Sequence, residues 1–124
     1  MSKRHAPGFL RAVEAAKARI QELTVDELRA RQRTESPPRL LDVREESEFA
    51  RDRIVGAEHL GKGILERDIE ARVPDAGTEL VLYCGGGYRS ALAAAALLDM
   101  GYAQVSSLAG GIRAWRERRY PLDA

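Results

Sequence analysis

The sequence predicts an α/β fold with a mostly parallel central sheet that is covered by helices on both faces. Short apolar runs typical of buried strands alternate along the chain with longer segments of helical periodicity. Glycine and proline clusters separate these segments. The length of 124 residues suits one core. We therefore expect strand–helix–strand units in a single three-layer domain over residues 22–124, preceded by a helical extension over residues 1–21.

The extension is expected to contain an amphipathic helix, because apolar residues recur at helical spacing over about residues 8–20. A second helix should begin after Thr24, since Thr24 and Glu27 have the spacing of a capping box. It should end near Arg33, shortly before a Pro-Pro pair. The elements expected after it are strands at residues 40–43, 57–60, 80–83 and 104–108 and helices at residues 45–50, 64–72, 90–100 and 112–119.

Local sequence patterns predict where these later strands and helices begin and end. The first strand segment, residues 40–43, is short, apolar and β-like. A glycine-bounded loop at residues 61–63 follows the second strand, and residues 74–78 form a turn before the third. Gly101 ends the helix before the last strand, and Gly110 and Gly111 precede the last helix.

The overall composition narrows the possible function classes. Lys and Arg total 20 against 19 Asp and Glu, so the charge gives no indication of a nucleic-acid or membrane partner. No stretch has the length of a membrane span, and the N-terminus lacks the pattern of a signal peptide. One cysteine and two histidines cannot supply a closed zinc site, so no metal is expected. The lone cysteine fits a reducing compartment, and we expect a cytoplasmic protein.

Cys84 is the strongest functional candidate, because it lies between the apolar strand segment ending at Tyr83 and the helical segment beginning at Ser90. Three consecutive glycines, residues 85–87, permit a tight bend there because they lack Cβ atoms. Such a bend would turn backbone N–H groups toward the sulfur, and a helix N-terminus stabilises a thiolate. The pattern therefore predicts a nucleophile. A pairing with His59, as in a thiol protease, would require the fold to bring distant residues together.

Asp42 and Arg44 follow another predicted strand. Ligands of parallel sheets bind at the carboxyl ends of the strands, so one crevice could contain both residues together with Cys84. A structural ion pair at the sheet edge explains Asp42 and Arg44 at least as well, and both roles stay open here.

Several ordered motifs give the chain a specific family resemblance. They are Leu41-Asp42-Val43-Arg44-Glu45 with Glu48-Phe49, Ile54-Val55-Gly56-Ala57, Cys84-Gly85-Gly86-Gly87-Tyr88-Arg89-Ser90, Leu108-Ala109-Gly110-Gly111-Ile112 with Trp115, and Tyr120-Pro121. Over about residues 22–122 the chain resembles a single-domain rhodanese, which is a sulfurtransferase. The N-terminal helix lies outside the resemblance.

The resemblance implies a rhodanese-like α/β fold and a catalytic Cys84 that cycles between thiol and persulfide without a cofactor. A small donor such as thiosulfate would supply the sulfur, and a thiol, cyanide or a sulfur-relay protein would accept it. Backbone N–H groups of the loop would stabilise negative charge on the sulfur. The residues implied in substrate binding are Gly85, Gly86, Gly87, Tyr88, Arg89 and Ser90, and the supporting residues are Asp42, Arg44 and Glu48.

Three side chains of the loop have competing interpretations. Arg89 contacts an anionic donor or braces the loop against Asp42 or Glu48, and these roles are favoured over simple exposure because a guanidinium makes several fixed hydrogen bonds. Tyr88 is either a pocket rim or an exposed tyrosine. Ser90 is most simply the N-cap of the following helix, and a hydrogen bond to the sulfur would be secondary.

Loop length separates sulfur transfer from a related chemistry. Rhodanese-like phosphatases and arsenate reductases have five residues between cysteine and arginine, and the phosphatase signature has histidine before the cysteine. Here four residues separate Cys84 from Arg89, and Tyr83 precedes the cysteine, which favours sulfur transfer. The chain also lacks a histidine and a proline that family members carry before the second strand, and this affects that connection more than the chemistry.

Other polar residues are interpreted as structural or solvated. His59 is expected to have structural partners, and Lys62 to be an exposed loop lysine. The arginines at positions 113, 116, 118 and 119 are interpreted as a solvated helix face rather than a nucleic-acid surface. The alternative function from another class is a sulfur-relay or regulatory module that receives sulfur from a specific protein and has little activity on small donors.

Overall fold

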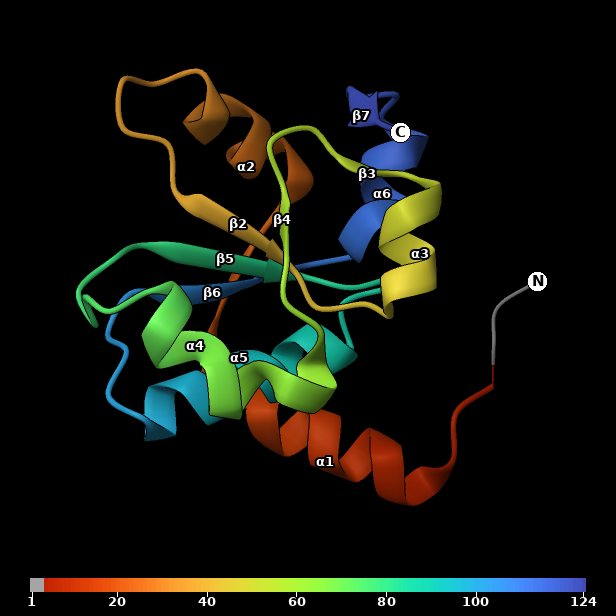
Figure 1. Ribbon diagram of the computed structural model, residues 1–124. Helices are drawn as coiled ribbons and strands as arrows, with labels where there is room; N and C mark the ends of the chain where they lie inside the picture. Colours follow the sequence, from red (N-terminus) through yellow and green to blue (C-terminus); the bar gives the residue numbers. More distant parts are fainter. Residues whose placement is uncertain (1–3) are drawn as a thin grey trace.

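The computed structural model describes residues 4–124 and confirms the predicted α/β architecture (Figure 1). Five strands form one sheet in the order β1-β6-β5-β2-β4, with β5 at its centre, and all neighbouring pairs are parallel. The carboxyl ends of the strands therefore share one edge of the sheet. The strands are β1 (Gln21–Leu23), β2 (Arg39–Asp42), β4 (Glu58–His59), β5 (Leu80–Tyr83) and β6 (Val105–Leu108).

Helices cover both faces of this sheet, as predicted (Figure 1). On one face lie α4 and α5, on the other lie α2 and α6, and α1 forms a further layer beyond α5. The helices are α1 (Pro7–Lys17), α2 (Val25–Gln32), α3 (Glu46–Arg51), α4 (Leu65–Arg72), α5 (Arg89–Asp99) and α6 (Gly111–Glu117), with the 3₁₀ turn η1 (Lys62–Ile64) before α4.

The central strand β5 divides its side chains between two apolar cores. Leu80 and Leu82 belong to the core under α4 and α5, whereas Val81 and Tyr83 belong to the core under α2 and α6. All four are at most 1% exposed, as expected for a parallel strand that is covered on both faces. Because successive side chains alternate, Cys84 faces the core under α5.

The core under α2 and α6 is closed by Trp115 of α6, which is fully buried. Its indole N–H donates to the Pro121 carbonyl at 2.9 Å, and the Tyr120 ring meets the indole edge-on at a centroid distance of 5.0 Å. These contacts tie the C-terminal segment to α6.

The N-terminal helix α1 packs against α5 through small apolar side chains. Val13 and Ala16 of α1 meet Ala91 and Ala95 of α5, and all four are buried. β1 follows α1 closely and joins the sheet edge beside β6. The division of the chain into an extension and a domain stays a prediction, and residues 1–3 of the predicted extension lie outside the described residues.

The structure contains three strands that the sequence does not predict. They are β1 and an antiparallel pair formed by β3 (Arg53–Ile54) and β7 (Leu122–Asp123). Strands of two or three residues are too short to show an alternating pattern. The capping box of α2 is confirmed, because the backbone N–H groups of Thr24 and Glu27 each donate to the other residue's side chain, at 2.8 and 3.1 Å.

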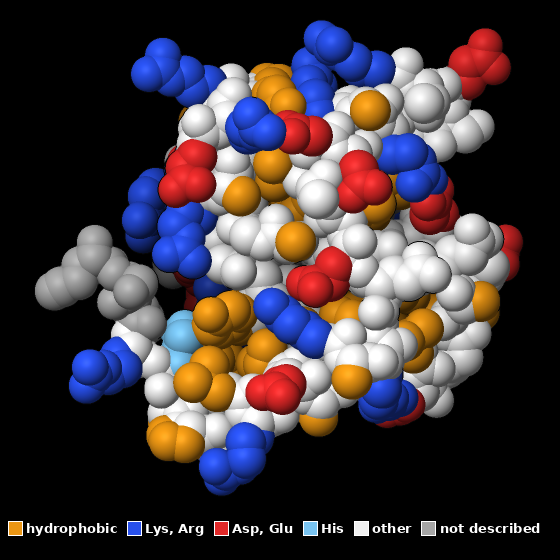
Figure 2. Space-filling view, turned by 180° about the vertical axis from the view of Figure 1, so that it is seen from behind, with side chains coloured by type: hydrophobic (Ala, Val, Ile, Leu, Met, Phe, Trp, Pro, Cys, Tyr) orange, Lys and Arg blue, Asp and Glu red, His pale blue; other side chains and the backbone are white. Residues whose placement is uncertain are grey.

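The surface mixes charges of both signs. Figure 2 shows Lys and Arg side chains interspersed with Asp and Glu, with small groups of hydrophobic side chains between them. Arg39 and Glu58 illustrate the pairing, with Nη2 and Oε1 2.7 Å apart. Among residues 4–124, no helix is both long enough and apolar enough to cross a membrane.

Candidate active site

Cys84 is the first residue after β5, and the turn that follows it leads into α5. Two backbone amides donate to its sulfur, from Gly87 at 3.2 Å and from Ser90 at 3.4 Å. The thiol in turn donates to Ser90 Oγ, 3.5 Å away. Since Cys84 is 1% exposed, its sulfur is held in a nearly enclosed position by groups that stabilise negative charge.

Glycines allow α6 to approach this loop closely. The amides of Ile112 and Arg113, in the first turn of α6, donate to the carbonyls of Cys84 and Gly85 at 3.0 and 3.1 Å. A Cβ atom on Gly111, whose φ is +57°, would lie 2.5 Å from the Cys84 carbonyl oxygen. The first N–H groups of α6, which have no partner within the helix, therefore hold the Cys84 and Gly85 carbonyls in place. A side chain at Gly111 would prevent this contact.

Ser90 contacts the sulfur, which was its secondary predicted role, and is not the N-cap of α5. The structure places Tyr88 at the N-cap position of α5, so the N-cap prediction for Ser90 is wrong. The helix begins one residue earlier than expected, and the Ser90 hydroxyl is buried beside the Ser107 hydroxyl of β6 at 2.8 Å. Ser107 thus supports the Ser90 hydroxyl that contacts the sulfur, and no local pattern predicts this because Ser107 lies on a distant strand.

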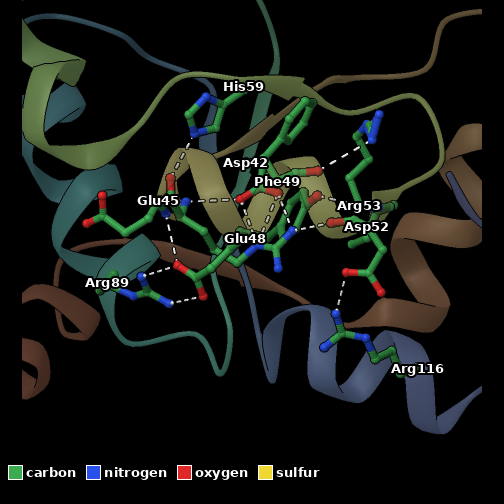
Figure 3. Close-up of polar contacts among 12 residues, drawn as sticks. Asp42, Glu45, Glu48, Phe49, Asp52, Arg53, His59, Arg89 and Arg116 are labelled. Atoms are coloured by element: carbon green, nitrogen blue, oxygen red, sulfur yellow. Dashed lines mark hydrogen bonds and ion pairs between the residues drawn. The ribbon is translucent and has the colours of Figure 1, made fainter. Parts of the chain in front are cut away.

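Arg89 pairs with Glu48 at the start of α3 (Figure 3). Its Nη1 donates to Glu48 Oε1 at 3.1 Å, and the same carboxylate accepts the Glu45 amide at 2.9 Å. Burial acts to raise the pKa of Glu48, but hydrogen bonds from Arg89 and the Glu45 amide hold that pKa below its ordinary value. Burial also acts to lower the pKa of Arg89, and the Glu48 carboxylate outweighs it, so this pKa is raised. The geometry matches loop bracing against Glu48.

Asp42, which Figure 3 labels, forms a buried ion pair with Arg44. The Arg44 side chain donates to the Asp42 carboxylate from Nη2 at 2.7 Å and from Nε at 3.0 Å. Nη2 also donates to the Asp52 carbonyl at 2.7 Å, and the Arg44 carbonyl contacts His59 Nε2 at 2.8 Å. Neither Asp42 nor Arg44 is among the described residues that line the cleft over Cys84. This arrangement fits the structural interpretation of the pair, and His59 has the structural partner expected of it.

A cleft of about 690 Å³ opens over the cysteine loop. The cysteine loop, a group of ring side chains and three arginines contribute to its lining. Among residues 4–124, no group of three or more His, Cys, Asp or Glu side chains could hold a metal ion. The residues lining the cleft are His5, Phe9, Glu48, Cys84, Gly85, Gly86, Tyr88, Arg89, Arg113 and Arg116.

Four of these lining residues were not expected in the site. Arg113 and Arg116 belong to the helix face that was predicted to be solvated, and both line the cleft. They are one helical turn apart, and α6 begins on the cysteine loop, so both point into the cleft. His5 and Phe9 come from the N-terminal segment and meet Tyr88, which is therefore part of the wall. No local sequence pattern indicates that the first turns of two distant helices, α1 and α6, lie at this cleft.

Comparisons with known proteins match the chain to one family of domains. The profile of the family described as "Rhodanese-like domain" matches residues 24–118. A thiosulfate sulfurtransferase GlpE from Stutzerimonas stutzeri (strain A1501) is 37% identical over 84 residues, which cover 68% of this chain and 74% of that protein. A sulfurtransferase from Allochromatium vinosum is 34% identical over 85 residues, covering 68% of this chain and 78% of that protein.

One similar solved structure matches nearly the whole length of this chain. It is a protein of unknown function from Rhodopseudomonas palustris CGA009, described as a possible tyrosine phosphatase. The TM-score is 0.82 at 31% identity, and the match covers 99% of each chain.

Proposed function

The chain belongs to the rhodanese-like domain family, and we propose that it moves a sulfane sulfur from a donor such as thiosulfate to a thiophilic acceptor through a persulfide on Cys84. The observation that carries this proposal is the pair of amides directed at the Cys84 sulfur, at 3.2 and 3.4 Å, on the floor of an open cleft. Relatives named for sulfur transfer support it.

In the donor step, the Cys84 thiolate attacks the outer sulfur of thiosulfate. The bond between the two donor sulfurs breaks, its electron pair leaves with sulfite, and the outer sulfur stays on Cys84 as a persulfide. The amides of Gly87 and Ser90 stabilise negative charge on sulfur before and after the transfer, as an oxyanion hole does for oxygen. The reaction needs no cofactor.

The surrounding residues have supporting roles in this proposal. The glycines of the loop let its backbone curve around the sulfur, as the φ of +96° at Gly87 illustrates. Arg89, braced by Glu48, keeps the loop in place and presents positive charge to an anionic donor. Asp42 and Arg44 stabilise the carboxyl end of β2 and the connection from β2 to α3.

Persulfide chemistry requires a reduced Cys84, and this favours a reducing compartment such as the cytoplasm. The acceptor is a thiol or cyanide, and a sulfur-relay protein is the alternative partner. In the relay function, Cys84 would receive sulfur from a persulfide-carrying protein and react poorly with small donors.

Intact-mass measurement after incubation with thiosulfate tests the proposal. We expect the wild-type protein to gain one sulfur atom and to release sulfite, whereas Cys84→Ser should gain nothing because a serine oxygen cannot form the persulfide. Circular dichroism should show the same fold for both proteins.

A parallel assay with an aryl phosphate addresses the description of the R. palustris protein. The four residues between Cys84 and Arg89 leave a loop suited to one sulfur atom, so we expect no appreciable phosphate hydrolysis. Cys84-dependent hydrolysis without any gain of sulfur would overturn the assignment. Sulfur gain from a persulfide-carrying protein but not from thiosulfate would favour the relay function.

A further inference from the structure

We propose that the cleft selects low-molecular-weight acceptor thiols that carry a carboxylate, and that Arg113 is the residue that recognises this charge. The inference rests on the proposed function, because it names the acceptor class of the same site.

The size of the cleft indicates a ligand larger than the simplest donor and acceptor. A volume of about 690 Å³ lies within the usual range for sites that enclose drug-sized molecules, and it far exceeds what thiosulfate or cyanide would fill. A thiol with a carbon skeleton of several atoms would occupy the space above the loop.

The charges of the cleft indicate an anion. Three of its lining side chains are guanidinium groups, whereas one is a carboxylate. Arg89 is paired with Glu48 at 3.1 Å, and Arg116 is paired with Asp52 at 2.6 Å. Arg113, by contrast, forms no ion pair within the described residues 4–124 and is exposed. Its positive charge is therefore available to a ligand.

Arg113 lies close to the reacting loop. A Cβ atom on Gly86 would be 2.7 Å from Arg113 Nη2, so the guanidinium rests over this glycine, two residues from Cys84. The backbone N–H of Arg113 donates to the Gly85 carbonyl at 3.1 Å, which anchors the base of the side chain to the same loop. A carboxylate bound here in bidentate fashion would hold a nearby thiol over the sulfur.

The ring side chains that line the cleft suit the carbon skeleton of such a thiol. The rings of His5 and Phe9 lie with centroids 5.2 Å apart, and the Tyr88 ring is 4.7 Å from that of His5. All three are partly exposed to the cleft. They add ring surface to a lining that also contains the arginines, so a ligand with one anionic part and one apolar part would find contacts for both in the same cleft.

The chemistry of the acceptor step balances. The acceptor thiolate attacks the outer sulfur of the protonated Cys84 persulfide. The sulfur–sulfur bond to Cys84 breaks, and its electron pair returns to Cys84 as a thiolate. The acceptor leaves as its own protonated persulfide, and no oxidant or reductant is consumed.

Single-turnover kinetics test the proposal. Wild type, Arg113→Gln and the control Arg67→Gln are each loaded with sulfur, and the loaded fraction is verified by mass so that differences in loading do not enter the result. Each is then mixed with mercaptosuccinate, which is anionic, or with 2-mercaptoethanol, which is neutral. The rate constants for loss of the persulfide are expressed per thiolate, because the two thiols ionise differently.

We expect wild type to prefer mercaptosuccinate by about tenfold, and Arg113→Gln to lose most of that preference. Arg67 is an exposed arginine of α4 outside the cleft, so Arg67→Gln should keep the wild-type ratio. Arg113→Lys should retain part of the preference, because lysine keeps the positive charge but lacks the planar guanidinium that binds a carboxylate with two hydrogen bonds.

Two results would overturn the inference: an equal rate with both thiols in the wild type, or an unchanged ratio in Arg113→Gln. A general loss of folding in Arg113→Gln is recognised by circular dichroism, in which case Arg113→Lys decides. Failure of the wild type to load any sulfur would instead contradict the proposed function.

Discussion

Glu48 connects the cysteine loop to the start of α3, because one carboxylate accepts hydrogen bonds from Arg89 and from the Glu45 amide. The side chains of Arg89 and Glu48 are 36% and 30% exposed. Solvent therefore screens their attraction, and such a pair contributes about 0.2 to 1 kcal/mol to the free energy of unfolding. Its larger effect is to hold the cysteine loop in one position against α3.

Replacing Arg89 should consequently affect activity more than stability. Arg89→Ala should lower kcat/KM for transfer from thiosulfate by about tenfold to a hundredfold, because small displacements of reacting groups cost that much. The free energy of unfolding should fall by about 1 kcal/mol or less. Steady-state kinetics and urea denaturation provide the two measurements. Glu48→Gln keeps the shape and removes the charge, so its effect should be smaller, and wild-type kinetics in both variants would show that the pair is dispensable.

The same pair should make stability depend on pH in the acidic range. The folded pKa of Glu48 lies below its ordinary value of about 4.5, so its contribution is fully present above that pH and is lost as the pH falls through the folded pKa. The raised pKa of Arg89 lies above the working range and adds no dependence there.

We therefore expect the difference in unfolding free energy between wild type and Glu48→Gln to shrink as the pH falls below about 4.5. Urea denaturation at a series of pH values from neutral to acidic measures this difference. A difference that stays constant or grows on acidification would contradict the pairing.

At the scale of elements, α6 serves as the clamp on the cysteine loop. Its first amides take the carbonyls of Cys84 and Gly85, and the glycine at its start permits that approach. The amides of the loop and of α5, meanwhile, point to the sulfur. One turn of backbone is thus held from both sides.

Gly111→Ala should break this clamp. The new Cβ would lie 2.5 Å from the Cys84 carbonyl oxygen at a φ of +57°, so the loop or α6 must move. We expect the free energy of unfolding to fall by about 2 kcal/mol or more, together with a loss of sulfur transfer. Gly63→Ala is the matched control, since a Cβ there meets nothing within 4 Å, and it should leave both quantities close to wild type. Equal behaviour of the two variants in urea denaturation would refute the clamp.

Elements with strong local patterns were predictable from the sequence, and elements that depend on distant partners were not. The apolar strand segments at residues 40–43 and 80–83 and the capping box at Thr24 contain their own signals, and the structure has them. β3 and β7 exist because their two segments meet, which no local pattern records. The same holds in the site: Cys84 and its glycines were evident, whereas Ser107 and Arg113 reach it from elements that are distant in sequence.

At the scale of the whole molecule, α1 adds a layer that reaches the site. It packs along α5 through Val13 and Ala16, while the segment at its start brings His5 and Phe9 to the wall of the cleft. The stability of this layer and the shape of the cleft are therefore linked through one helix.

Val13→Ala should weaken the attachment of α1. Val13 is 4% exposed, and removing its two methyl groups should lower the free energy of unfolding by roughly 2 kcal/mol. Leu10→Ala is the control, because Leu10 is 41% exposed and its truncation should change the free energy by less than about 0.5 kcal/mol. Urea denaturation followed by circular dichroism compares them, and equal values would show that α1 is loosely attached.

The position of Trp115 has an optical consequence. It is the one tryptophan of the chain, and it is buried in the helix whose first turn holds the carbonyls of the cysteine loop. An indole in a dry core emits at shorter wavelength than one in water. The chain therefore contains an intrinsic fluorophore in the helix that holds its reacting loop, and a red shift of its emission signals that water has reached α6, without any attached dye.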